Sequence, residues 1–142
     1  MSVLRTGVIG VGHLGYHHAR LYGQLDGVEL VGVVDLDASN RKRAEDELGV
    51  SAYASIEELL VQGVDAVSVV TPTMTHATVV LQVLEAGVHV LVEKPIAPTL
   101  EEAEAMVCAA RANGKRLQVG HIERFNGAVM ALFDAIKAPR FV

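Results

Sequence analysis

Short apolar runs alternate with longer helix-like stretches along the chain, and this alternation is the feature that most limits its possible folds. Each apolar run is rich in valine, leucine or isoleucine and is bounded by glycine, proline or a helix-capping residue. Six strand–helix steps in one order, with short connections, predict an α/β fold: a doubly wound parallel sheet in three αβα layers. The expected strands cover residues 3–9, 29–35, 51–54, 65–70, 88–93 and 116–120.

Helical stretches fill the intervals between these strands. They are expected from residue 14 to 22, from a cap at Asp37 or Ser39 to 48, and over 55–62, 75–86, 99–113 and 126–137, with residues 140–142 extended. Serine or threonine followed three residues later by glutamate forms a capping box, and this pattern opens the helices at Ser55 and Thr99. No repeat, linker or low-complexity segment interrupts the series.

Composition excludes several other classes of protein. The net charge of −5 gives no electrostatic footprint for nucleic acid. No apolar run reaches the roughly 18 residues of a membrane span, and no signal peptide is visible, so we expect a soluble, cytoplasmic protein. The single cysteine, Cys108, excludes an internal disulfide, and its apolar neighbours predict a buried structural thiol. No trio of His, Asp, Glu or Cys has metal-ligand spacing, so no metal is predicted.

A glycine-rich hexapeptide at residues 10–15 lies between the first expected strand and the first helix. This G-x-G-x-x-G pattern is typical of Rossmann dinucleotide-binding domains when it has this context. Gly10 permits the tight turn, Gly12 lets the backbone approach a pyrophosphate, and Gly15 allows the helix to pack on the strand. His13 and Leu14 would offer backbone N–H groups to the phosphates. The alternative, a tight turn that binds nothing, is disfavoured by the strand–loop–helix context.

Asp35 lies twenty residues after Gly15, at the end of the second strand. A carboxylate there can accept hydrogen bonds from the ribose hydroxyls of the adenosine half and would repel the 2′-phosphate of NADP. NAD is therefore predicted in preference to NADP. Arg41 and Arg43 weaken this preference, because a nearby arginine can accommodate the phosphate. Asp37 is expected to serve as a helix cap.

Two further segments resemble the glucose-fructose oxidoreductase / inositol dehydrogenase (Gfo/Idh/MocA) family. Residues 71–76, Thr-Pro-Thr-Met-Thr-His, are similar to its T-P-N-x-x-H segment, with Thr73 in place of the usual asparagine. Residues 86–95, AGVHVLVEKP, match its A-G-K-H-V-L-x-E-K-P segment. Both occur at the family spacing from the glycine loop, and the resemblance covers essentially the whole chain. It implies an NAD(P)-dependent dehydrogenase acting on a sugar or nucleotide sugar.

The resemblance also implies that Lys94 is the catalytic lysine. Pro95 stiffens the backbone after it, and the lysine cation could polarise a hydroxyl or carbonyl oxygen and help move a proton. A surface lysine at a strand end is the alternative. Glu93 either orients Lys94 or binds the nicotinamide ribose.

Cofactor contacts are further expected at the carboxyl ends of the strands, where ligands of open α/β sheets bind. Thr71, Lys94 and His121 each follow a predicted strand and should share one edge of the sheet with the glycine loop. From the Thr-Pro segment the expected cofactor residues are Thr71, Pro72, Thr73 and His76, although His76 could equally bond to backbone. Among the remaining histidines, His17 and His18 are interpreted as surface or packing residues and His89 as structural.

Residues 118–126, QVGHIERFN, resemble the family's entry to a second domain. Their sequence is similar to that of the subgroup acting on UDP-N-acetylglucosamine and related nucleotide sugars. His121 and Arg124 either reach nicotinamide or substrate, or hold the two halves together at the junction.

The resemblance divides the chain in two. Residues 1–121 form the expected NAD(P)-binding domain, and residues 122–142 form a junction helix and the start of a truncated substrate domain. In the family, a second α/β domain supplies most of the substrate site, so this fragment alone should bind cofactor and turn over little. A homo-oligomer is expected for the complete enzyme.

Two other interpretations remain open. A non-catalytic redox sensor or scaffold would also bind NAD, but it would not require a lysine in an E-K-P segment. Folds of the dihydrodipicolinate, homoserine or biliverdin reductase type share the first strand–helix–strand unit but lack the paired Thr-Pro and Glu-Lys-Pro segments.

Overall fold

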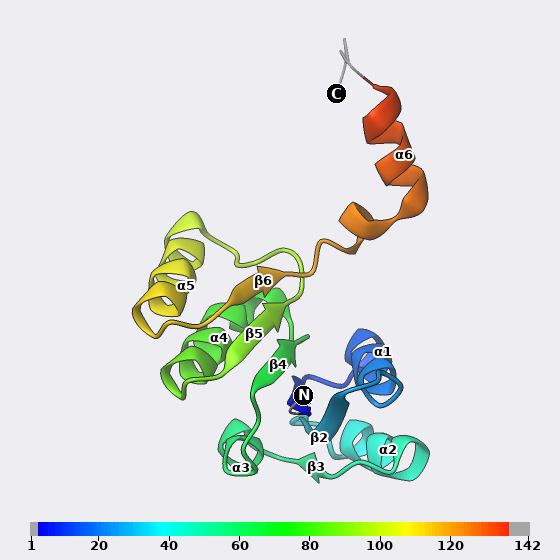
Figure 1. Ribbon diagram of the computed structural model, residues 1–142. Coiled ribbons are helices and arrows are strands. Elements are labelled where there is room, and N and C mark those ends of the chain that lie inside the picture. The colour runs from blue at the N-terminus through cyan, green and yellow to red at the C-terminus, as the bar shows by residue number, and fades with distance from the viewer. Residues whose placement is uncertain (1–2, 137–142) are drawn as a thin grey trace.

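A parallel six-stranded sheet forms the centre of the molecule in the computed structural model, which describes residues 3–136 (Figure 1). Its strands are β1 (Leu4–Ile9), β2 (Val28–Val34), β3 (Ala52–Tyr53), β4 (Ala66–Val69), β5 (His89–Val92) and β6 (Leu117–Val119). They run in the order β3-β2-β1-β4-β5-β6, and every neighbouring pair is parallel. The direction of winding reverses between β1 and β4, so the predicted doubly wound sheet is confirmed.

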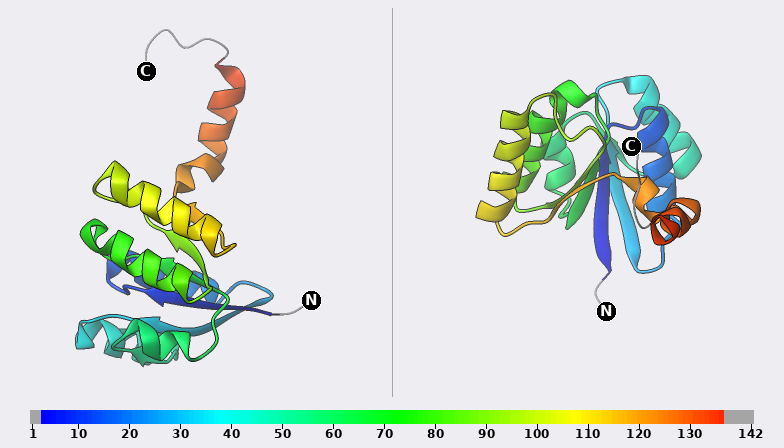
Figure 2. Two further views of the ribbon diagram at one scale, coloured as in Figure 1. Left: turned by 90° about the vertical axis from the view of Figure 1, so that its left-hand side faces the viewer. Right: turned by 90° about the horizontal axis from the view of Figure 1, so that it is seen from above.

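Helices cover both faces of the sheet. They are α1 (His13–Tyr22), α2 (Ala38–Leu48), α3 (Ile56–Leu60), α4 (His76–Glu85), α5 (Leu100–Ala112) and α6 (Gly127–Ala135), with 3-10 turns η1 (Thr73–Thr75) and η2 (Ile122–Phe125). Helices α1 and α2 lie on one face, and α3, α4 and α5 lie on the other (Figure 2). The predicted three-layer αβα arrangement is therefore confirmed.

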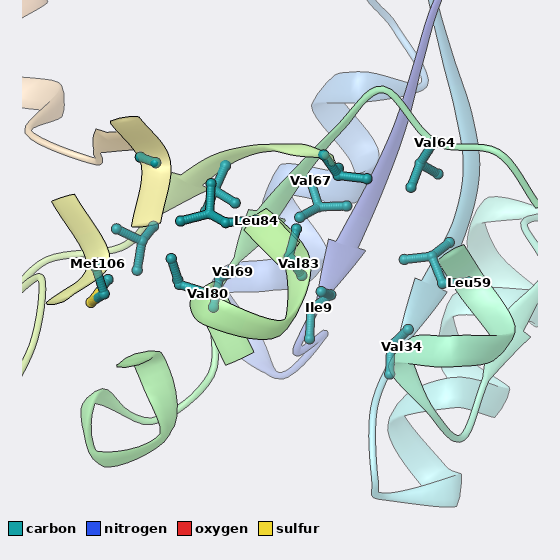
Figure 3. Close-up of a cluster of buried hydrophobic side chains, with 14 of the residues drawn as sticks. Ile9, Val34, Leu59, Val64, Val67, Val69, Val80, Val83, Leu84 and Met106 are labelled. Carbon is teal, nitrogen blue, oxygen red and sulfur yellow. The ribbon is translucent and has the colours of Figure 1, made fainter. Parts of the chain in front are cut away.

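The core divides into two apolar clusters because successive side chains of a strand point to opposite faces. On β1, Val8 packs toward α1 and α2, whereas Ile9 belongs to the larger cluster beneath α3, α4 and α5. Figure 3 shows this larger cluster, in which Val80 and Leu84 of α4 and Met106 of α5 meet the valines of β4. Because both faces of the sheet are buried, the sequences of its strands are largely apolar runs.

Local capping signals account for several element boundaries. Asp37 accepts a hydrogen bond from the Ser39 amide and caps α2, and Ser55 forms a complete capping box with Glu58 at α3, both as predicted. Thr99 caps α5, but the capping box predicted there is incomplete, because the Glu102 side chain accepts a hydrogen bond from the Thr99 hydroxyl and not from its backbone amide. The helix predicted from residue 75 is preceded by the 3-10 turn η1, which begins directly after Pro72. The extended segment predicted at 140–142 lies outside the described residues.

One prediction about the core is wrong: the Cys108 thiol is exposed, not buried. The inward positions of α5 are Met106 and Ala110, four residues apart and therefore on one face of the helix. Cys108 lies midway between them in sequence, so the helical repeat of 3.6 residues carries it to the opposite face. Apolar neighbours in sequence were misleading because they do not share its side of the helix.

The final helix extends away from the body of the domain (Figure 1). Helix α6 leaves large apolar side chains exposed, among them Phe133 and Met130. Within residues 3–136, no helix combines the length and apolar character needed to cross a membrane.

Candidate cofactor-binding site

A groove of about 750 Å³ lies beside the carboxyl ends of β1, β2 and β4, and we call it the cofactor groove. It is bounded by the glycine loop, the end of β2, the start of α3 and the segment after β4. Of the predicted cofactor residues, the groove brings together Gly10, Gly12, Asp35, Thr71 and Pro72. This position, at the point where the strand order reverses, is where doubly wound folds bind their ligands.

Two glycines of the loop are required by the fold itself. Gly10 has φ +86°, a conformation that side chains rarely adopt, and a Cβ there would lie 2.7 Å from the Val70 carbonyl oxygen. A Cβ on Gly15 would lie 1.8 Å from the carbonyl oxygen of Gly10. The close approach of α1 to the turn therefore depends on the absence of a side chain at Gly15.

Gly12 differs, because its surroundings leave open space where a side chain would be. A Cβ there would meet no atom within 4 Å, and φ is −58°. The first N–H groups of a helix have no intrahelical partner, and in α1 these include the amides of His13 and Leu14. Gly12, the N-cap of α1, has no side chain that could bond to them. A helix N-terminus with open space before it suits a phosphate group. The space above Gly12 thus fits the pyrophosphate of a dinucleotide.

Asp35 is held at the edge of the groove by its neighbours. Its carboxylate accepts hydrogen bonds from the Val11 amide at 2.8 Å, from the Asp37 amide at 2.9 Å and from the Asn40 side chain at 3.3 Å. A carboxylate has about four acceptor positions, so one remains for a ligand hydroxyl. The bond to Val11 fixes the acid against the glycine loop.

The two arginines that could accommodate a 2′-phosphate are engaged with backbone carbonyls. Arg41 donates to the carbonyl oxygens of Asp35 at 2.7 Å and Leu36 at 3.0 Å. Arg43 donates to those of Val11 at 2.8 Å and Gly12 at 3.1 Å, and its guanidinium stacks over the Tyr16 ring. Both side chains therefore brace the loops around the groove.

His76 lies beneath the edge of the sheet, with only 1% of its surface exposed. Its Nε2 is 2.9 Å from the Thr71 carbonyl oxygen, and its Nδ1 is 3.0 Å from that of Pro95 and 3.2 Å from that of Ile96. The alternative of backbone bonding is thus the arrangement observed. His76 ties the Thr-Pro segment to the Glu-Lys-Pro segment and has no surface to offer a ligand. Thr73, in η1, is half-buried and does not line the groove.

Lys94 is exposed and follows β5 at the same edge of the sheet, and its peptide bond to Pro95 is cis. The preceding residue, Glu93, is buried, and one of its carboxylate oxygens accepts a hydrogen bond from the Lys94 amide at 3.1 Å. Gly120 leaves room for that carboxylate, because a Cβ there would lie 2.6 Å from it. Glu93 therefore contacts the main chain of Lys94.

His18, interpreted from the sequence as a surface or packing residue, is half-buried and faces polar groups of the sheet. Its Nε2 lies 3.4 Å from the Glu93 carboxylate, and its Nδ1 lies 3.1 Å from the Ser68 hydroxyl. Burial lowers the pKa of His18 below its usual 6.5, an effect that the Glu93 charge opposes. A sequence signal existed, since His18 follows Gly15 by three residues and so shares the inward face of α1.

The two predicted junction residues lie outside the groove. His121 and Arg124 are exposed on and beside η2, on the path from β6 to α6. Both follow the carboxyl end of β6, but neither lines the cofactor groove. His89 has a structural contact, as interpreted: its Nδ1 accepts a hydrogen bond from the Arg116 amide at 2.9 Å. Among residues 3–136, no cluster of three or more His, Cys, Asp or Glu side chains is placed to hold a metal ion.

The groove, the uncapped helix and the acid at the end of β2 define a dinucleotide-binding domain of the Rossmann type. Residues 4–121 match the Gfo/Idh/MocA family, described as an oxidoreductase family with an NAD-binding Rossmann fold, and the chain belongs to this family. The predicted family and cofactor are thereby confirmed.

Relatives with described activities include two kinds of sugar dehydrogenase. UDP-N-acetylglucosamine 3-dehydrogenase from Acidithiobacillus ferrooxidans is 44% identical over 100% of this chain and 45% of its own length. Its crystal structure superposes with a TM-score of 0.89 over 99% of this chain and 46% of that chain. The NAD-dependent scyllo-inositol 2-dehydrogenase of Bacillus subtilis is 37% identical over 88% of this chain and 37% of that protein.

A solved structure provides a ligand-bound comparison. The WlbA dehydrogenase from Bordetella pertussis, in complex with NADH and UDP-GlcNAcA, is 32% identical with a TM-score of 0.89, over 96% of this chain and 40% of that chain. The chain thus spans less than half the length of each of these relatives. Because the relatives are enzymes, the redox-sensor alternative is not favoured.

Proposed function

We propose that this chain is the cofactor-binding half of a dehydrogenase that transfers a hydride between nicotinamide and a secondary alcohol of a nucleotide sugar or sugar. The single observation that carries the cofactor-binding part of the proposal is the open space at Gly12, directly before a helix with no side-chain cap. The free amides of α1 hold the pyrophosphate, Asp35 takes the adenosine ribose, and Thr71 and Pro72 line the path toward nicotinamide.

Lys94 is the proposed acid–base residue. Oxidation of a secondary alcohol releases a hydride from carbon and a proton from the hydroxyl group, and bound NAD supplies the hydride acceptor. As a neutral amine, the Lys94 side chain would take the hydroxyl proton and return it in the reverse reaction. As an ammonium, it would stabilise negative charge developing on the same oxygen. Its exposure at the edge of the sheet, on a backbone held by Glu93, supports this role.

A nucleotide sugar is the substrate class best supported by the relatives. The 44%-identical protein is a UDP-N-acetylglucosamine 3-dehydrogenase, and a UDP sugar is bound in the WlbA complex. We propose that the substrate contacts lie mainly in the part of these relatives that the chain does not cover, and that residues 122–142 form the junction toward it. His121 and Arg124 are the proposed junction contacts to nicotinamide or substrate.

Assays of the complete gene product with NAD⁺ and either UDP-N-acetylglucosamine or myo-inositol test this function. We expect turnover of the nucleotide sugar, and a fall in kcat of roughly 10²–10⁴ for Lys94→Met. Lys94→Arg, which keeps the charge but cannot exchange a proton, should remain impaired. The 142-residue chain alone should turn over little. Full activity of Lys94→Met, or rapid turnover of a simple sugar by the chain alone, would overturn the proposal. Cell fractionation and sedimentation of the same protein test the cytoplasmic location and homo-oligomer.

A further inference from the structure

Four polar side chains form a connected network in the interior between α1 and the sheet. His18 and Tyr22 come from α1, Ser68 from β4, and Glu93 from the end of β5. The Tyr22 and Ser68 hydroxyl oxygens are 2.6 Å apart, Ser68 is 3.1 Å from His18 Nδ1, and Glu93 is 3.4 Å from His18 Nε2. Ser68 is fully buried in an otherwise apolar strand. Buried polar groups of this kind must find partners, and these partners are one another.

One assignment of protons satisfies the whole network. An ionised Glu93 carboxylate can only accept, so the Nε2 proton of a neutral His18 faces it at an N···O distance of 3.4 Å, and Nδ1 is left as an acceptor. The Ser68 hydroxyl donates to that nitrogen and accepts the Tyr22 proton in turn. Burial favours this neutral form of the ring. The second oxygen of Glu93 remains free to accept the Lys94 amide.

The network therefore ends on the backbone of the proposed catalytic lysine. Glu93 contacts His18 through one oxygen and the Lys94 amide through the other, and Gly120 leaves space for the carboxylate between them. Carbonyls on the far side of Lys94, those of Pro95 and Ile96, are held separately by His76. The exposed side chain thus extends from a backbone that is fixed on both sides.

We propose that His18 is a positioning residue, which sets the orientation of the Glu93 carboxylate and through it the main chain of Lys94. The proposal rests on the proposed role of Lys94 in proton transfer. It also links the helix that receives the pyrophosphate to the segment that carries the lysine, because His18 lies on α1. Protonation of His18 would turn Nδ1 into a donor, so the Ser68 hydroxyl would accept from the ring and donate to Tyr22 instead. The titratable groups acting on His18 are Glu93 and His17 on the same helix, and Tyr22 is linked to it only through Ser68.

Amide NMR of the 142-residue chain across a pH titration tests this coupling without requiring catalysis. We expect the Lys94 amide resonance to shift with a midpoint below 6.5, equal to the midpoint of the His18 ring resonances. In His18→Gln this transition should disappear, and in the matched control His17→Gln it should persist. A packing role alone would not make the Lys94 amide follow the ionisation of His18.

Two results would overturn the proposal. One is a Lys94 amide resonance that does not shift at the midpoint of the His18 ring, and the other is a pH-dependent shift of this amide that is still present in His18→Gln. If His18→Gln does not fold, the midpoints of the Lys94 amide and of the His18 ring in the unsubstituted chain still test the proposal, because it requires them to be equal. If the Lys94 amide did not follow the ionisation of His18, the expected fall in kcat for Lys94→Met would still stand. If Lys94→Met kept full activity, the Lys94 amide could still follow the ionisation of His18. The positioning role and the proposed function are therefore tested separately.

Discussion

The Val11 amide donates a 2.8 Å hydrogen bond to the Asp35 carboxylate and so joins the glycine loop to the end of β2. The acid proposed to recognise the ribose therefore also shapes the turn that receives the pyrophosphate. Binding of the adenosine ribose and binding of the pyrophosphate should therefore both depend on this contact.

Asp35→Ala should weaken NADH binding by removing the ribose acceptor and loosening the loop. Hydrogen bonds to charged groups contribute about 1.5–3 kcal/mol, so the Kd for NADH should rise roughly 10- to 150-fold in a fluorescence titration. Asp37→Ala is the matched control, because Asp37 caps α2 only two residues away. It should lower stability by about 1 kcal/mol and leave NADH affinity nearly unchanged. Equal effects of the two changes on NADH binding would contradict this assignment.

Alanine at Gly12 and at Gly15 should have opposite consequences. Gly12→Ala places a methyl group in open space, so the fold should lose about 1 kcal/mol or less while NADH binding is lost or severely weakened. Gly15→Ala forces a methyl group against the Gly10 carbonyl and should cost about 3 kcal/mol or more. Urea unfolding together with NADH titration separates the two effects. Unimpaired NADH binding by a folded Gly12→Ala variant would contradict the ligand role of this glycine.

His76→Ala should destabilise the domain by about 2–4 kcal/mol, because it leaves a cavity and removes the partner of the Thr71 and Pro95 carbonyls. Met74→Ala, an exposed change in the preceding turn, is the control and should stay within about 0.5 kcal/mol. Chemical denaturation measures both. A neutral His76→Ala would show that the two segments do not depend on this residue.

The stability of the domain should fall as the pH drops below 6.5, partly because of His18. Its folded pKa is lowered by burial, so the unfolded chain binds a proton more readily in the window between the folded pKa and 6.5. The contribution of His18 to the free energy of unfolding is therefore present above pH 6.5 and is lost as the pH falls through the pKa of His18 in the folded protein. Urea unfolding at pH values above and below 6.5 should show a smaller pH-dependent loss in His18→Gln than in the unsubstituted chain. An identical loss in both would contradict this account.

Most of the fold could be predicted from the sequence because its signals are local. The apolar strands, the caps at Asp37 and Ser55 and the tight turn at Gly10 each depend on residues close together in the chain. The burial of Cys108 was predicted wrongly because the prediction used the apolar character of its neighbours in sequence and did not consider which face of the helix the residue lies on.

The site was only partly predictable, since its remaining contacts join distant segments. His18 and Glu93 are 75 residues apart in the chain, and only the packing of α1 on the sheet brings them together. The two roles considered for His76, cofactor contact and backbone bonding, could not be separated from the sequence, because a motif gives the residue type but not the direction of the ring, which the structure turns into the interior.

Titration of the 142-residue chain with NADH and, separately, with NADPH, followed by nicotinamide fluorescence, tests whether the chain binds NAD in the cofactor groove. We expect saturable binding of NADH and weaker binding of NADPH, because the Asp35 carboxylate repels a 2′-phosphate and both arginines nearby are engaged with carbonyls. No saturable binding of NADH by the folded chain would contradict the claim.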